Sequence, residues 1–156
     1  MGLKDSLKIK GVVRGWFRNA KTGKLVDYFE HYNLITDAGK AAVSARLVGD
    51  TAVANRGEVT YGAVGLDATV PATGNTVLGN ELFRKLLTLR SFVENVATFQ
   101  VFFNTSEANG ALKEFALFGE DATAVADTGT MFNHVNIDKI KTVAITLTIE
   151  AQITIG

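Results

Sequence analysis

The residues most able to do chemistry, the histidines and the acidic groups, are not spaced for a metal site. His31 and His134 are far apart in the chain, and neither has a second ligand at helical or strand spacing. The loop from Asp121 to Gly129 is rich in Asp and Thr. It lacks the glycine and the glutamate that an EF-hand needs at its sixth and twelfth positions. We therefore expect polar strand histidines, a polar surface loop and no metal site.

Motifs for covalent catalysis and for nucleotide cofactors are absent from the sequence. No serine lies in a Gly-x-Ser-x-Gly turn, no glycine-rich phosphate loop is present, and the chain has no cysteine. Three glutamates could pair as in a glycosidase, but their spacing selects no two of them: Glu81, Glu107 and Glu114. We predict no catalytic residues, no cofactor and no enzymatic activity.

A basic, aromatic strand face is the best candidate for a binding surface. Arg14, Trp16 and Arg18 alternate with apolar residues and so share one face of a strand. A cationic ribbon with an aromatic residue can bind single-stranded nucleic acid, but specific binders usually carry a net basic charge. This chain has 16 basic and 16 acidic residues, so we expect nucleic acid not to be its partner. Two interpretations remain, a solvated strand face and a protein interface anchored by Trp and Arg.

The first ten residues form a second candidate contact. Leu3, Leu7 and Ile9 lie among charged residues and bury too little surface to order this segment alone. Such an arm can order against a neighbouring molecule. We therefore predict an N-terminal docking arm over residues 1–10 and a folded domain over 11–156. The complete candidate interface is Leu3, Leu7, Ile9, Arg14, Trp16 and Arg18.

The elements that position these residues are mostly strands. Alternation predicts a hairpin over residues 9–32 with its turn at 19–23, and later strands include one over 86–94. One helix is predicted to begin at Thr36 or Asp37 and to end before Gly49. We expect its inward face to contain Ala38, Ala42 and Ala45, together with Leu47 or Val48.

The last segment has the clearest strand pattern in the chain. Its apolar residues alternate with threonines and other polar residues, which predicts one buried and one solvated face. The predicted core positions are Val143, Ile145, Leu147, Ile149 and Ile153. About eight such strands with one short helix indicate a mainly β protein, a single antiparallel β-sandwich or jelly-roll-like domain.

Composition limits the environment of the protein. No apolar run approaches the roughly 18 residues that span a membrane, and the N-terminus lacks the apolar stretch of a signal peptide, so we expect no membrane partner. Charge is uneven along the chain. Residues 1–57 carry ten Lys and Arg against five Asp and Glu, a net of +5, whereas residues 58–156 carry six against eleven, a net of −5.

Four stretches, taken in order, resemble small virion structural proteins of tailed bacteriophages. The resemblance covers roughly residues 10–156, and the helix entry is also similar to the N-terminal domains of phage tail fibres. The stretches are Tyr32-Asn-Leu-Ile-Thr-Asp-Ala-Gly-Lys40, Asn75-Thr-Val-Leu-Gly-Asn-Glu-Leu-Phe-Arg84, Lys113-Glu-Phe-Ala-Leu-Phe-Gly119 and Gly129-Thr-Met-Phe-Asn-His-Val135.

This resemblance implies a β-sandwich that is present in many copies on a virion. The copies would decorate the head or belong to the tail or fibre. Their partners would be other copies of the chain and the major capsid or tail protein, and the protein would be made in the cytoplasm of a bacterial host. The resemblance transfers no catalytic residues. A carbohydrate- or nucleic-acid-binding module on the same scaffold is the alternative, because sandwiches host many functions.

Overall fold

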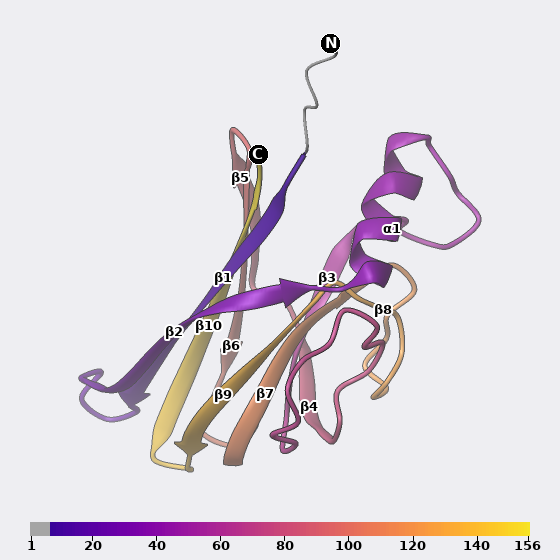
Figure 1. Cartoon of the computed structure of the whole chain (residues 1–156). Helices are drawn as coiled ribbons and strands as arrows, with labels where there is room; N and C mark the ends of the chain where they lie inside the picture. The colour runs from indigo at the N-terminus through magenta and orange to yellow at the C-terminus, as the bar shows by residue number, and fades with distance from the viewer. Residues whose placement is uncertain (1–6) are drawn as a thin grey trace.

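The computed structural model describes residues 7–156, which form one antiparallel sheet path curled into a half-barrel and one short helix (Figure 1). This confirms the predicted mainly β, sandwich-like fold. The strand order is β4-β3-β7-β9-β2-β1-β10-β6-β5, and β8 pairs with β7. The strands are β1 (Ile9–Asn19), β2 (Leu25–Ile35), β3 (Val59–Gly65), β4 (Glu81–Leu86), β5 (Leu89–Val93), β6 (Val96–Phe103), β7 (Gly110–Gly119), β8 (Thr130–Met131), β9 (Asn133–Lys141) and β10 (Ile145–Ile155).

The main core joins the two halves of this path. One half is β2-β1-β10-β6-β5 and the other is β4-β3-β7-β9; β2 and β9 connect them through only two residue pairs, Leu34 with His134 and Ile35 with Asn133. Alternate residues of each strand point inward, as the period of two requires. Fully buried members from both halves include Val13, Phe17, Phe103, Leu112, Phe115, Leu117, Leu147 and Ile149.

A smaller cluster covers the outer face of the second half. It contains Ala63, Leu78, Ala116, Phe118 and Met131, and loops 66–80 and 120–129 contribute residues that pack against it. As a result, β7 is buried on both faces from Glu114 to Gly119. This explains why its sequence reads as a continuous apolar run instead of an alternating one.

The helix α1 (Asp37–Leu47) begins as predicted, and Ala42 of its predicted inward face is buried, but the rest of that face is not. Thr36 is the N-cap, and its hydroxyl accepts the Gly39 N–H at 3.0 Å. The buried helical residues are Gly39 and Ala42. At Gly39 the helix lies so close to Phe132 that an added Cβ would come within 2.6 Å of the Phe132 carbonyl oxygen. The predicted inward residues Ala38 and Ala45 are half-buried, and Leu47 and Val48 are 79% and 82% exposed. Only the first two turns dock, so the expected contribution of the last turn was wrong.

The last strand is shorter than predicted. Val143 is 72% exposed and lies before β10, in the turn closed by the Ile145 N–H bond to the Thr142 carbonyl. Its assignment to the core was therefore wrong. Leu147 and Ile149 are buried as predicted, whereas Ile145 and Ile153 are half-buried where they pack at the margins of the core.

The first strand begins at Ile9, where the hairpin was predicted to begin, so the last two residues of the predicted arm belong to the sheet. Ile9 and Lys10, which the sequence placed in the arm, pair with Ile155 and Thr154 of β10. Lys8 and Gly156 exchange two further backbone hydrogen bonds, at 2.6 and 2.8 Å.

Candidate functional site

A buried carboxylate, Glu114, holds the long loop of residues 66–80 against β7. It is 1% exposed. Its oxygens accept hydrogen bonds from three backbone N–H groups, those of Gly79 at 3.0 Å, Asn80 at 2.9 Å and Asp67 at 3.3 Å. Oxygen Oε2 also lies 3.0 Å from Nε2 of His134. A buried charge needs such partners, and here they anchor a loop.

His134 continues this network on its other side. Its Nδ1 lies 3.0 Å from Oδ1 of Asn75, and that oxygen also accepts the Ala72 N–H at 2.7 Å. The neighbouring hollow of about 300 Å³ is lined by Asp67, Asn75, Glu114 and His134 among others. Both ring nitrogens of His134 thus lie within hydrogen-bond distance of side chains of this chain, Asn75 and Glu114.

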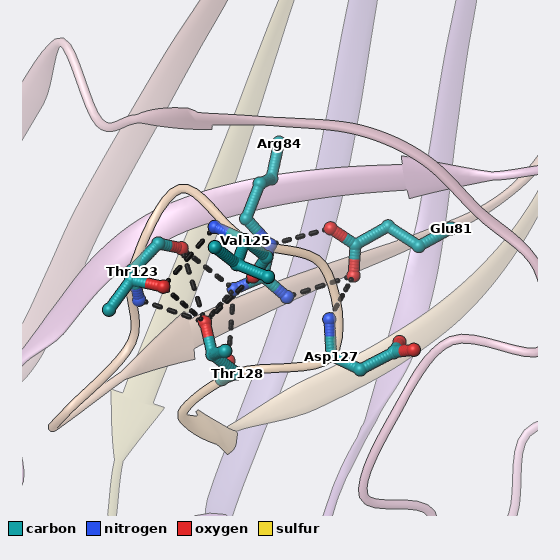
Figure 2. A network of polar contacts seen from close by, with 6 residues as sticks. All are labelled: Glu81, Arg84, Thr123, Val125, Asp127 and Thr128. Carbon is teal, nitrogen blue, oxygen red and sulfur yellow. Dashed lines mark hydrogen bonds and ion pairs between the residues drawn. The ribbon is translucent and has the colours of Figure 1, made fainter.

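A second buried network, around Arg84, holds the loop of residues 120–129 (Figure 2). Arg84 and Glu81 form a two-pronged ion pair at 2.5 and 2.8 Å, and both side chains are almost fully buried. Figure 2 shows the guanidinium also donating to the loop: to the carbonyls of Thr123 at 3.1 Å and Thr128 at 2.9 Å. The guanidinium also lies 4.5 Å from the ring centre of Phe118. The Asp- and Thr-rich loop of residues 120–129 is therefore held to the sheet by an arginine.

A third network closes the turn between β6 and β7. Lys141 is 1% exposed, and its Nζ donates to the Asn104 carbonyl at 2.7 Å and to Oδ1 of Asn109 at 2.9 Å. Burial lowers the pKa of Lys141. Nearby, Glu107 accepts from Lys85 at 2.7 Å and from the Asn104 N–H at 2.9 Å. Burial alone would raise the pKa of Glu107, but these hydrogen bonds outweigh it and the pKa is lowered.

The three glutamates singled out in the sequence therefore lie in three separate networks. Glu81 pairs with Arg84, Glu107 with Lys85, and Glu114 with His134. Within residues 7–156, no three His, Asp or Glu side chains gather closely enough to hold a metal ion. No helix in that part of the chain is long and apolar enough to cross a membrane.

The predicted basic face exists, but acidic neighbours balance its charge. Arg14 pairs with Glu30 at 2.6 Å and lies 3.8 Å from Glu150. The hydrogen bond from Arg14 lowers the pKa of Glu30. Trp16 packs on Tyr28, with ring centres 5.7 Å apart. Arg18 lies beside the hairpin turn at the exposed end of the same face.

The predicted arm residues lie elsewhere. Leu3 is outside the described residues, and Leu7 is 67% exposed. Ile9 is on the opposite face of β1 from Arg14, because odd and even residues of a strand alternate. It lines an apolar hollow of about 150 Å³ together with Ile35, Val43, Phe132, Ile153 and Ile155. Among the described candidate residues, Ile9 therefore lies on a different face from Arg14, Trp16 and Arg18.

The sequence analysis missed an exposed apolar edge at β5. All five residues of Leu89–Val93 are exposed, with Phe92 at 77% and Val93 at 74%. The predicted strand over 86–94 contains β5, but periodicity does not tell an edge strand from a central one. The two-residue turn Glu94-Asn95 joins β5 to β6 in a hairpin.

Searches for similar proteins found no match among family models, curated proteins or solved structures.

Proposed function

We propose that this protein is a structural subunit of a tailed-phage virion, present in many copies as a head decoration protein or as a tail or fibre component. The exposed apolar edge strand β5 is the observation that supports assembly into many copies. Monomeric proteins usually protect such edges with charges, proline or a covering segment. An edge with Phe92 and Val93 exposed fits a subunit that is covered by its neighbours.

The phage assignment rests on the four stretches of resemblance, and their placement in the fold supports treating them as one unit. Thr36, from the first stretch, donates to the Met131 carbonyl in the fourth. Asn75 and Gly79, from the second, contact His134 and Glu114 of the fourth and third. The four stretches thus contact one another around β7 and β9, although they are separated in the sequence.

The buried charges also favour a structural role. Each of the networks described above fixes a loop or a turn to the sheet, and the chain carries no net charge. Rigid loops on a neutral sandwich suit a protein packed among identical neighbours, where weak self-repulsion is an advantage.

Quantitative mass spectrometry of gradient-purified particles from the producing host tests this proposal. We expect the chain to co-purify with virions at a copy number that is a multiple of the particle's symmetry. Its absence from particles would overturn the proposal. Saturable binding of the isolated chain to a glycan or a single-stranded oligonucleotide, without particle association, would instead support the binding-module alternative.

A further inference from the structure

We infer that two copies of this chain pair through the open edges of their β5 strands, in antiparallel fashion, about a two-fold axis at Ser91. This inference deepens the proposed function and rests on it, because it names the contact by which copies associate. On its inner side β5 pairs with β6, from Leu89 opposite Gln100 to Val93 opposite Val96. On its outer side, no strand among residues 7–156 pairs with it.

The backbone groups needed for this contact point outward at alternate residues. The two-residue turn closes on the pair Val93 and Val96, which exchange both hydrogen bonds in such hairpins. Ser91 and Leu89 then also bond to β6, and the N–H and C=O groups of Arg90 and Phe92 face the open edge. These four groups are the template that an added strand requires.

The β5 sequence complements itself about Ser91. In this register, Leu89 faces Val93 of the second copy, and Arg90 faces Phe92 of the second copy. The outward groups of Arg90 and Phe92 then satisfy one another twice, once on each side of the axis. Leu89 and Val93 bring apolar side chains together on the outer face of the joined sheet, a pairing that stabilises antiparallel strands.

Charge does not oppose this pairing. Arg90 already lies 3.5 Å from Glu58 of its own chain, which offsets the approach of the two Arg90 side chains. Glu94, which has no ion-pair partner in the described part of the chain, lies diagonally across from Arg90 of the second copy. A further open edge, along the first part of β2, carries Asp27 and Glu30, which protect it from strand addition.

The contact is expected to be weak for an isolated pair. Five paired residues span about 17 Å, so the buried area falls below the roughly 1,200–2,000 Å² of stable complexes. Repeated contacts on a particle would multiply such a weak interaction. A covalent trap is therefore the appropriate test for the purified chain.

Ser91→Cys places one thiol per chain on the proposed axis, in a protein with no other cysteine. Residues directly opposite in a strand pair have Cα atoms about 4.5–5.5 Å apart, within the range of a disulfide. Val93→Cys is the matched control. It lies on the same strand and the same face, but its thiol and that of the second copy would be about 14 Å apart, too far to bridge.

With oxidised glutathione as the oxidant, we expect Ser91→Cys to form a disulfide dimer and Val93→Cys to stay monomeric on non-reducing gels. Sedimentation of the unaltered chain, which has no cysteine, should show a dimer fraction that grows with protein concentration. The same measurement on Val93→Lys should show a smaller dimer fraction. Val143→Lys, at an equally exposed site outside β5 (72% against 74%), should leave it unchanged. Equal cross-linking of both cysteine variants, or of neither, would overturn this register. Neither result decides the proposed function, which the copy number on purified particles tests separately.

Discussion

Replacing Glu81 by Gln tests whether the buried ion pair with Arg84 holds the loop of residues 120–129. The change keeps the size of the side chain but leaves the Arg84 charge buried without its counter-ion. Removing one partner of a buried pair costs about 3–5 kcal/mol of unfolding free energy. Arg84 keeps its bonds to the Thr123 and Thr128 carbonyls and its position over Phe118, so we expect the lower end, about 3 kcal/mol.

Chemical denaturation at neutral pH measures this loss, and the melting temperature should fall by about 6–12 °C for a chain of this size. Glu30→Gln is the control, since it makes the same substitution in another Arg–Glu pair whose Glu30 side chain is 51% exposed. Because exposed pairs contribute little, we expect almost no shift from Glu30→Gln. If the two variants lost equal stability, burial of the Arg84 pair would not be what holds the loop.

Three further outcomes follow from the core and the turn networks. Leu147→Ala should cost about 2–5 kcal/mol through lost burial and a cavity, whereas Thr148→Ser should cost under about 0.5 kcal/mol; equal losses in a urea titration would contradict the strand orientation. The pKa of Glu107 is lowered in the folded state, so its contribution to stability is present above its unfolded pKa of about 4.3 and is lost as pH falls through the folded value. Glu107→Gln should therefore flatten the decline of melting temperature between about pH 5 and pH 3, and an unchanged acid profile would show that the hydrogen bonds from Lys85 and Asn104 do not stabilise the fold.

Strand periodicity predicted the half of the fold in which one face is solvated. Val13, Phe17, Leu147 and Ile149 are buried because alternation records which side of a strand meets the core. The pattern carried less information where both faces are covered, as in β7, and where a strand ends. Val143 continues the apolar alternation by type, yet the turn at Thr142 removes it from the core.

The buried networks could not be predicted, because they join residues far apart in sequence. Arg84 meets Thr128, and Glu114 meets Gly79 and His134, only after β4, β3, β7 and β9 have assembled into one sheet. Single residues of these types look like surface residues in a sequence. The β5 edge was missed for a related reason, since edge position depends on the order of strands in the sheet and not on local pattern.

The uneven charge of the sequence does not survive folding, and this determines how association should respond to salt. The basic residues of the first part of the chain meet acidic residues of the second: Arg14 lies 3.8 Å from Glu150 and Arg56 lies 3.1 Å from Glu120. In the opposite sense, Lys139 pairs with Asp27 at 2.7 Å. The +5 and −5 segments therefore interleave, so they do not form separate patches that could attract a neighbouring copy.

We accordingly expect the β5 contact to depend on backbone hydrogen bonds and apolar pairs, which salt does not screen. Raising the salt concentration from 0.1 to 1 M shortens the Debye length from about 10 Å to about 3 Å, which weakens exposed charge contacts selectively. The rate of Ser91→Cys cross-linking should change little across this range, with Val93→Cys as the background. A steep fall in cross-linking at 1 M salt would mean that charged side chains, such as Arg90 and Glu94, drive the association, and would refute an edge held mainly by strand pairing.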